Sequence, residues 1–459
     1  MDLHLDLGGD GPLRARCEHA LRAAVRRLPA GTRLPPTRAL AAELGVSRGV
    51  VVEAYAQLAA EGYLLTRRGG GTFVAATPQP ASGAAGTGGA AGAGGAAGAS
   101  GAAGAGGAAG DGRGRGAGAA RAPRFDLRPA LPALDGAVRP AWGRALARVL
   151  RTTPDARLGY PDPRGEPELR EALAESLARR RGVLTTADEV VVTGGLGPGL
   201  PFVWRLLAAR GVTRVAIEDP CWPRLAHTLS TAGLQAVPTP VDEEGLHADA
   251  LDGVGAVFVT PAHQYPTGAV LSPGRRAHLI EWARANRAFV FEDDYDAEFR
   301  YDRHPVGSLQ GLAPDVVIYG GSTSKTLAPG LRIGWLVLPR GIGGDSPAPP
   351  PVLDQLALAD LIARGDFDRH LRDRRRLYRS RREALLQALA NRLPDNAITG
   401  AAAGLHAVLH VQDAHEAQRR AAANGVVLDA IDGALVVGYA NLPESQAPAA
   451  VEALSRALL

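Results

Sequence analysis

The stretch 316–338 reads VVIYGGSTSKTLAPGLRIGWLVL. Its apolar ends, 316–319 and 333–338, predict β-strands, and polar residues lie between them. Lys325, in this polar part, is the only lysine of the chain, although lysine and arginine together number 51. Codon bias in a GC-rich genome explains why lysine is scarce. Because arginine forms no stable imine with an aldehyde, the lysine that remains is a candidate for covalent chemistry.

Phosphate-binding groups lie close to Lys325 in the sequence. Ser322 and Ser324 offer hydroxyls, and Arg332 offers a guanidinium shortly after the lysine. Hydroxyls and a guanidinium suit a phosphate dianion, and a lysine amine suits an aldehyde. The string therefore predicts a site for an aldehyde cofactor that carries a phosphate.

Short apolar runs alternate with amphipathic helical stretches through residues 125–459. This alternation predicts an α/β fold with a mainly parallel central sheet covered on both faces. The expected strands are 189–193, 214–217, 256–260, 288–291, 316–319 and 333–338. Polar clusters that follow five of them are 194–195, 218–220, 261–264, 292–295 and 322–325. Since ligands bind at the carboxyl ends of strands in such folds, we expect one shared site.

An acidic cluster, 292–295, follows the strand expected at 288–291. Pyridoxal chemistry requires a carboxylate at the pyridine nitrogen, which keeps the ring an electron sink. Tyr295 could donate a hydrogen bond to the ring phenolate. A metal site is the alternative, which is disfavoured because no histidine lies at ligand spacing and a cationic phosphate cradle is near. The cluster therefore favours pyridoxal phosphate, and we expect no metal.

Two further loops offer contacts to a cofactor ring. In 218–224, EDPCWPR, Trp222 could stack on the ring and Arg224 could meet a carboxylate; the alternative is a packed tryptophan beside a surface arginine. In 260–268, TPAHQYPTG, His263 or Gln264 could hydrogen-bond the ring; the alternative is a structural turn. The residues alone leave both alternatives open.

Composition divides the chain into three regions. Residues 11–76 mix apolar and basic positions at helical spacing, and we expect a winged helix-turn-helix domain there. Residues 77–122 are nearly all glycine and alanine and cannot bury a core, so we expect a flexible linker spanning roughly 35–40 Å. Residues 123–459 are expected to form the α/β domain.

The first region has the element order of a winged helix-turn-helix. A short helix at 39–44 precedes the turn at 45–46, and Ser47 is a suitable N-cap for the next helix. Arg48 begins that helix, where a recognition helix meets base edges. Segment 61–74 reads as two strands around a glycine tip, a wing with arginines for phosphate contact. The apolar stripe of the second helix comprises Val51, Ala54, Tyr55 and Leu58.

Residues 34–75, LPPTRALAAELGVSRGVVVEAYAQLAAEGYLLTRRGGGTFVA, resemble the GntR family of winged-helix regulators. The resemblance implies that the partner is double-stranded DNA. The positions that match family contacts to DNA are Arg38, Ser47, Arg48 and Gly69. We add Arg68 because of its charge and position. Gly49 departs from the family, which often has a polar residue there, and this departure leaves base specificity open.

Residues 125–459 resemble a fold-type I aminotransferase domain. Joined to the first region, they resemble the MocR/GabR subfamily of GntR regulators. The strings that carry the resemblance are GYPDPRGEPELREAL, IEDPCWPR, TPAHQYPTG, FEDDYDAEFRY and STSKTLAPGLRIGWLVLP. The two resemblances cover nearly the whole chain except the linker.

The resemblance implies that Lys325 is the catalytic residue and holds pyridoxal 5'-phosphate as an imine. It also implies that Asp293, rather than Asp294, pairs with the ring nitrogen and that Tyr295 faces the ring hydroxyl. Arg224 lies where the family can bind an effector carboxylate. The other expected cofactor contacts are Ser322, Ser324 and Arg332 at the phosphate, Trp222 on the ring, and His263 and Gln264. The family implies a head-to-tail homodimer.

Two departures from the family bear on activity. Residues 193–200, TGGLGPGL, replace a polar turn against the phosphate and leave only backbone N–H groups, of which Pro198 has none. Between Ala421 and Ser455 no arginine is present to clamp a substrate α-carboxylate. Full transamination of an ordinary α-amino acid is therefore disfavoured.

We therefore predict a DNA-binding transcription regulator that depends on pyridoxal phosphate. It would sense an amine, an amino acid or pyridoxal phosphate itself. The alternative is a catalytically active aminotransferase with an appended DNA-binding domain. A third hypothesis is a cofactor-binding domain that has lost its chemistry and only oligomerises the protein.

Net charge, cysteine content and the distribution of apolar residues limit the possible cellular compartment and partners of the protein. The formal charge is +4 and the sequence pI is about 9.3, so any DNA-binding charge must be local. Two cysteines, Cys17 and Cys221, make no disulfide framework. The sequence shows no basic and apolar leader and no apolar run long enough to span a bilayer. We expect a cytoplasmic protein without a membrane partner.

Overall fold

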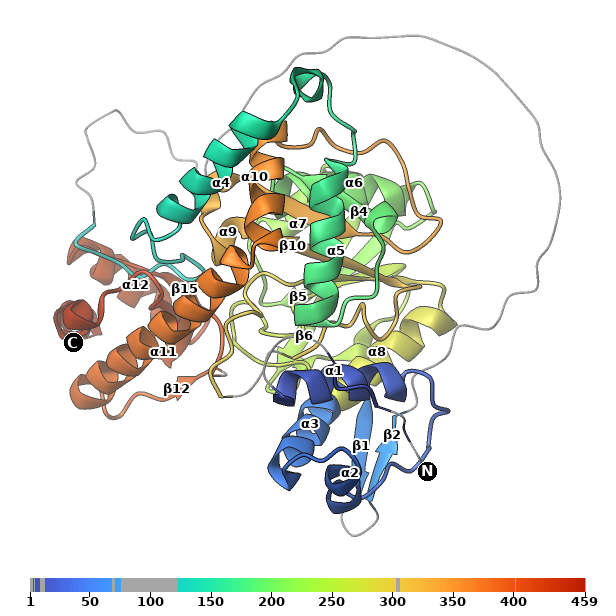
Figure 1. The fold of residues 1–459 in the computed structure, drawn as a ribbon. Coiled ribbons are helices and arrows are strands. Elements are labelled where there is room, and N and C mark those ends of the chain that lie inside the picture. Colours follow the sequence, from blue (N-terminus) through green and yellow to red (C-terminus); the bar gives the residue numbers. More distant parts are fainter. Residues whose placement is uncertain are drawn as a thin grey trace.

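The structure is a computed structural model that describes residues 3, 5–8, 13–67, 71–75, 123–302, 306–400 and 402–458. A small N-terminal domain, blue in Figure 1, lies against a larger α/β domain on the side of helix α8 (Pro273–Ala285). The predicted linker at 77–122 and two expected DNA contacts, Arg68 and Gly69, lie outside the described residues and stay predictions.

The N-terminal domain is a helix-turn-helix followed by a β-hairpin, as predicted. Its elements are α1 (Leu13–Val25), α2 (Thr37–Glu43), α3 (Arg48–Ala60), β1 (Leu64–Arg67) and β2 (Gly71–Val74). The strands pair antiparallel. The predicted apolar stripe of α3 is buried. Ser47 lies at the N-cap of α3 with extended backbone, but its side chain makes no capping hydrogen bond.

A sheet of eight strands forms the centre of the large domain. In spatial order the strands are β4 (Val190–Thr193), β11 (Gly334–Val337), β10 (Val317–Ser322), β9 (Phe289–Asp293), β8 (Ala256–Val259), β5 (Arg214–Asp219), β6 (Gln235–Asp242) and β7 (Gly245–Leu246). Only β11 and β7 run against their neighbours. The six predicted strands are all present, and the mainly parallel sheet is confirmed.

The direction of β11 brings distant residues to one edge of the sheet. Gly334, at the start of β11, pairs with Ser322 at the end of β10 and with Thr193 at the end of β4. Because β11 is antiparallel, its beginning meets the carboxyl ends of the parallel strands. Arg332, which precedes β11, therefore reaches the edge at which ligands bind in such folds.

Helices cover both faces of the sheet because side chains alternate along its strands. Phe258 and Phe291 point toward α6 (Leu196–Ala208) and α7 (Leu225–Ser230) and belong to one apolar cluster with them. Val257 and Val290, one position earlier, belong to the cluster of the opposite face, together with residues of α8. The apolar residues of the N-terminal domain join that second cluster.

The rest of the chain forms outer helices and a small C-terminal subdomain. The outer helices are α4 (Arg139–Thr152), α5 (Pro167–Arg181), α10 (Val352–Ala363) and α11 (Asp366–Arg392), while the short helix α9 (Thr323–Thr326) directly follows β10 at the edge of the sheet. The subdomain contains β12 (Ile398–Thr399), β13 (His406–His410), α12 (Ala414–Ala423), β14 (Val426–Val427), β15 (Asp429–Ile431), β16 (Ala434–Gly438) and α13 (Ala447–Leu458). Strand β3 (Phe125–Asp126) pairs with β14 and so joins the start of the large domain to its end.

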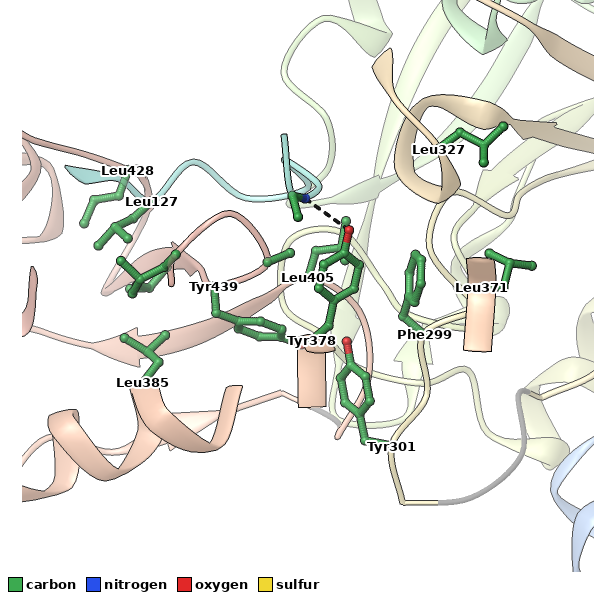
Figure 2. Packing of buried hydrophobic residues seen from close by; sticks show 14 of the residues in the cluster. Leu127, Phe299, Tyr301, Leu327, Leu371, Tyr378, Leu385, Leu405, Leu428 and Tyr439 are labelled. Atoms are coloured by element: carbon green, nitrogen blue, oxygen red, sulfur yellow. Dashed lines mark hydrogen bonds between the residues drawn. The ribbon is translucent and has the colours of Figure 1, made fainter. Parts of the chain in front are cut away.

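Aromatic residues pack where the subdomain meets the large domain (Figure 2). The hydroxyls of Tyr301 and Tyr439 both donate to the carbonyl oxygen of Gly404, at 2.5 and 2.8 Å. The hydroxyl of Tyr378 accepts from the backbone N–H of Ala133 at 3.1 Å, the dashed contact in Figure 2. These bonds fix the segment around Gly404 beside the site described below.

Within the described ranges, no helix is both long and apolar enough to cross a membrane.

Phe291 is expected to be one of the residues on which the large domain most depends. Its ring is buried, stacks on Phe258 with centroids 5.1 Å apart, and lies 5.8 Å from the ring of Trp204. Replacing Phe291 by alanine leaves a cavity and is expected to lower the free energy of unfolding by about 3–5 kcal/mol. Urea unfolding measures this loss. Leu184→Ala, at an exposed position, is the control and should cost about 0.5 kcal/mol or less.

Candidate functional site

Lys325 lies on the short helix α9, directly after β10. Burial lowers the pKa of its amine from the ordinary value, and the carboxylates of Asp296 and Asp293 partly offset this effect. A lower pKa gives more neutral amine near pH 7, and the neutral amine is the nucleophile. The environment of Lys325 therefore suits covalent attachment of an aldehyde.

The two neighbouring aspartates at the end of β9 have different surroundings. Asp294 Oδ2 lies 2.6 Å from Arg181 Nε and accepts the hydroxyl of Tyr319 at 2.5 Å. Asp293 Oδ1 is buried and has no hydrogen-bond partner in the described part of the chain. Burial, then the nearby Asp294, raise the pKa of Asp293 well above its ordinary value, while Lys325 lowers it. A protonated ring nitrogen would give Asp293 the cation that it lacks, which supports the prediction of Asp293 rather than Asp294.

Tyr295 is oriented by a histidine. His263 Nδ1 lies 3.0 Å from the Tyr295 hydroxyl oxygen and 3.0 Å from Asp296 Oδ2. We assign the proton to Nδ1 because a carboxylate oxygen accepts it. Burial raises the pKa of Tyr295 well above its ordinary value, so the phenol keeps its proton. His263 thus holds the Tyr295 oxygen and leaves the O–H free to donate to a cofactor oxygen.

The backbone at Gly404 packs closely against the ring of His263 and fixes its position. A Cβ on Gly404 would come within 2.1 Å of His263 Cε1, and Gly404 has a φ of +72°. The ring of His406 lies 5.0 Å away, and its Nε2 donates to the carbonyl oxygen of Pro266 at 3.0 Å. Burial lowers the pKa of His406 to about 3, so this ring is neutral.

Histidine and carboxylate side chains gather here at distances that a metal ion could bridge. One ligand atom from each of His263, Asp296 and His406 lies within 4.8 Å of the other two. The bonds of His263 to Tyr295 and Asp296, and of His406 to Pro266, give both rings a structural role. We therefore assign no metal to this group.

Gln264 ties two loops of the site together. Its side-chain Nε2 donates to the carbonyl oxygens of Pro220 at 2.8 Å and Tyr265 at 2.7 Å, and its Oε1 accepts the Thr267 hydroxyl at 2.7 Å. These bonds occupy the amide and join the 260–268 loop to the loop that carries Trp222. A direct contact of Gln264 with a cofactor ring stays a prediction.

The groups expected to hold phosphate meet at the start of α6. A Cβ on Gly195 would lie 3.2 Å from Arg332 Nη2, and a Cβ on Gly334 would lie 2.7 Å from the carbonyl carbon of Gly195. Only glycines leave room for this approach. Helix α6 begins at Leu196, so its first backbone N–H groups are free to meet an anion.

Two hydroxyls complete this cradle. Ser322 and Ser324 are half-buried at the end of β10 and the start of α9, and Ser322 Oγ accepts the backbone N–H of Ser324 at 3.3 Å. Backbone N–H groups, two hydroxyls and a guanidinium fit a phosphate dianion. Together with the unpartnered Asp293 Oδ1, the cradle fits pyridoxal phosphate.

Trp222 and Arg224 lie at the outer side of the site. The Trp222 side chain is 36% exposed, and Arg224, at the N-cap of α7, is exposed. Arg224 has no side-chain hydrogen bond or ion pair within the described residues. Both side chains are available to a ligand, and their predicted contacts with the ring and with an effector carboxylate stay predictions.

Several residues of the site carry no recognisable signal in the sequence. Asp296 follows Tyr295 in the quoted acidic string, so its proximity could have been noticed. Gly404, His406 and Arg181 come from segments more than 100 residues from this string, and only the fold brings them near it.

The expected DNA contacts lie away from this site. Arg38, Ser47 and Arg48 are all exposed. Glu61, just after α3, faces the large domain, since a Cβ on Gly307 would lie 3.0 Å from its Cδ. Because α3 rises about 1.5 Å per residue, Arg48 at its start lies roughly 18 Å from that contact. The start of α3 is thus free to meet DNA.

Sequence profiles of two families match the chain. The profile of bacterial regulatory proteins of the gntR family matches residues 13–74, and that of aminotransferase class I and II matches residues 132–454. The pyridoxal phosphate that the second family uses is the group that the residues above fit.

Curated relatives match most of the chain. It is 33% identical to the "Probable rhizopine catabolism regulatory protein MocR" of Rhizobium meliloti, with 86% of this chain and 80% of that protein covered. It is 33% identical to the HTH-type pyridoxine biosynthesis transcriptional regulator PdxR of Corynebacterium glutamicum, with 85% and 82% covered. It is 32% identical to the HTH-type transcriptional regulator TauR of Rhodobacter capsulatus, with 83% and 80% covered.

Solved structures match the large domain. An archaeal alanine:glyoxylate aminotransferase aligns with a TM-score of 0.65 at 23% identity, covering 73% of this chain and 90% of that one. LysN, an α-aminoadipate aminotransferase of Thermus thermophilus, aligns with a TM-score of 0.64 at 25% identity, covering 73% and 92%. These likenesses establish the fold of the domain.

Glu218, at the end of β5, gives the site a pH dependence. Its carboxylate is buried and accepts the Thr260 hydroxyl at 2.5 Å, and burial raises its pKa to about 7. The folded state therefore binds this proton more tightly than the unfolded state, whose pKa is about 4.5. The stability that the proton contributes is present at low pH and is lost as the pH rises from about 4.5 to 7.

Replacing Glu218 by glutamine removes this titration. We expect the melting temperature of Glu218→Gln, relative to the unaltered protein, to rise between pH 5 and pH 8. Burial also raises the pKa of Glu292, but both proteins share this group and its effect cancels in the comparison. Thermal unfolding at a series of pH values measures the difference, and a difference independent of pH would contradict the assignment.

Proposed function

Because this chain belongs to the MocR/GabR subfamily of GntR-type transcriptional regulators, with an effector domain of the aminotransferase class I and II family, we propose that the effector domain senses a small molecule at Lys325 and transmits its presence to DNA. The small molecule is an amine, an amino acid or pyridoxal phosphate itself. The observation that carries the proposal is a set of contacts that leads from Asp294, beside Asp293 in the chain, through Arg181 to the N-terminal domain.

The contacts begin at Asp294, which follows Asp293 in the chain. Asp294 pairs with Arg181, and the two side chains are 3% and 1% exposed. Arg181 Nη1 donates to the carbonyl oxygen of Val306 at 2.6 Å, and its own carbonyl oxygen accepts the N–H of Ser308 at 2.9 Å. Arg181 therefore fixes the segment 306–308 relative to the aspartates.

The N-terminal domain touches the residues on either side of these bonds. Glu61 packs against Gly307, and Arg26 Nη2 donates to the carbonyl oxygen of Gly182 at 2.8 Å. Glu61 is itself held by Arg22 through two hydrogen bonds of 2.8 and 2.9 Å. A shift of the aspartates on ligand binding would thus reach the N-terminal domain through one buried arginine.

When bound, pyridoxal phosphate supplies an electrophilic carbon and an electron-withdrawing ring. Lys325 would hold it covalently, Asp293 would pair with the ring nitrogen, and Tyr295 would donate to the ring oxygen. The cradle of Arg332, Ser322 and Ser324 would hold the phosphate. Arg224 would receive the carboxylate of an amino-acid effector.

The aminotransferase alternative is not favoured. The named relatives are regulators, and the segment from Ala421 to Ser455 contains no arginine for a substrate α-carboxylate. The intact set of Lys325, Asp293 and Tyr295 is compatible with a half-reaction on a bound amine.

The functional unit in this proposal is a head-to-tail homodimer. Large apolar side chains are exposed on α4 and the segments beside it: Leu134, Leu150, Leu158 and Tyr160. Tyr160 is fully exposed. Large exposed apolar side chains along one segment are typical of a surface that a partner covers, and a second copy of this chain is the partner that the family implies.

Lys325→Ala tests whether the lysine carries the signal. We expect pyridoxal phosphate to change the affinity of the unaltered protein for DNA selected from a random pool. In Lys325→Ala the response should vanish or require much more cofactor, because the covalent bond is lost. Fluorescence anisotropy of labelled DNA measures both affinities. An equal response in the two proteins would contradict the proposal.

Arg48→Ala tests the DNA-binding surface. Loss of a guanidinium at a base edge is expected to weaken binding to the selected DNA by about 1–3 kcal/mol, with a much smaller effect on random DNA. Arg27→Ala is the matched control, because Arg27 is an exposed arginine of the same domain just after α1. Equal losses in the two variants would argue against Arg48 as a contact.

A further inference from the structure

A cavity of about 270 Å³ lies where the N-terminal domain meets the large domain. One wall is α1, with His19 and Arg22, together with Glu61. The opposite wall is formed by the end of α5 and by the first half of α11. It is separate from the cofactor site, since neither Lys325 nor the phosphate cradle lines it.

Guanidinium groups dominate the lining. The arginines are Arg22, Arg179, Arg180, Arg181, Arg372 and Arg375. The carboxylates are Glu18, Glu61, Glu298 and Asp368. The cavity thus holds more positive than negative side chains, and both domains contribute cations to it.

The carboxylates do not neutralise all of these cations. Asp368 is shared by two arginines, with Oδ2 at 2.9 Å from Arg179 and Oδ1 at 3.3 Å from Arg180. Arg375 donates only to a backbone carbonyl, that of Glu298, at 2.7 and 3.0 Å. Arg372 is exposed and has no hydrogen bond or ion pair among the described residues. Among the described residues, the two α11 arginines that line the cavity, Arg372 and Arg375, thus have no carboxylate partner.

The lowered pKa values of Arg375 and His19 agree with this excess of positive charge. Burial lowers the pKa of Arg375, and Glu298 offsets this only in part. Burial also lowers the pKa of His19, and Arg22 and Arg26 lower it further. Positive groups on both walls are therefore destabilised in their charged forms, and an anion between them would relieve this.

We propose that this cavity binds a small polyanion, a phosphate ester or a di- or tricarboxylate, between the N-terminal domain and the effector domain. Arg372 and Arg375 hold the anion from the large domain, and His19 and Arg22 face it from α1. The volume lies just below the roughly 300–1,000 Å³ of small-molecule sites, which suits a compact metabolite. An anion held by both walls fastens the DNA-binding domain in its docked position.

The test uses the full-length protein saturated with pyridoxal phosphate, so that the phosphate cradle at Arg332 is already occupied. Inorganic phosphate and succinate are titrated separately by calorimetry at constant ionic strength, with acetate as the monoanion. We expect saturable binding of at least one of the two polyanions, and the preferred one identifies the class. Slower hydrogen exchange in α1 should accompany it.

Variants on α11 locate the binding. Arg372→Gln should weaken binding about tenfold or more, as expected for the loss of a charge-assisted hydrogen bond, and should leave the fold intact because Arg372 has no partner among the described residues. Arg376→Gln is the matched control on the same helix, since Arg376 is 81% exposed and pairs with Asp373. Absence of polyanion binding, or equal binding in the two variants, would overturn the proposal.

The test of polyanion binding in the cavity is independent of the sensing role proposed for Lys325. Polyanion binding that persists in Lys325→Ala while the DNA response to pyridoxal phosphate is absent from the unaltered protein would sustain the cavity and reject the sensing proposal. The reverse pattern would reject the cavity alone.

Discussion

The buried pair of Arg181 and Asp294 is the interaction on which the arrangement of this molecule depends. The two side chains are almost completely excluded from solvent, and their closest atoms are 2.6 Å apart. Burial lowers the pKa of Arg181, but Asp294, Tyr319 and Glu298 together more than offset this, so its pKa is raised and the guanidinium stays charged. Removing either partner would leave an uncompensated buried charge, which typically costs about 3–5 kcal/mol. The pair therefore holds the end of α5 against the end of β9.

Two functions meet at this pair. On one side, Asp294 pairs with Arg181 and accepts a hydrogen bond from Tyr319. Asp293 Oδ1 has no hydrogen-bond partner in the described chain, and a cofactor nitrogen would require such a free carboxylate. On the other side, two residues of the N-terminal domain contact the surroundings of Arg181. Arg26 donates to the carbonyl oxygen of Gly182, the next residue in the chain, and Glu61 packs against Gly307 in the segment that Arg181 fixes. A single arginine thus separates the roles of two adjacent aspartates and borders the contact between the domains.

Much of the fold could be predicted from the sequence because its signals are local. Apolar runs gave the positions of six strands, and the lone lysine with its serines marked the carboxyl edge of the sheet. The antiparallel direction of β11 was not predicted, although it is what brings Arg332 to Gly195. The strand β6, which includes Pro238 and Pro240, was missed because proline is unusual inside a sheet.

The parts of the site that escaped prediction depend on contacts between distant segments. Gly404 packs against His263, and the hydroxyls of Tyr301 and Tyr439 hold Gly404 through its carbonyl oxygen. Figure 2 shows these two tyrosines within the aromatic cluster. Gln264 bridges two loops through its side-chain amide, a role that its place in the sequence does not indicate. The spacing of residues along the chain does not predict such contacts. The position of the DNA-binding domain on α8 likewise follows from packing alone.

We infer that the state of the cofactor site reaches the docked DNA-binding domain through Arg181. Hydrogen exchange of the full-length protein, with and without pyridoxal phosphate, tests it most directly. We expect the cofactor to change hydrogen exchange in α1 and at 61–63 but not in the remote helix α13. We expect Arg181→Gln to lose this response while still binding the cofactor. Cofactor binding that leaves α1 and 61–63 unchanged in the unaltered protein would contradict it.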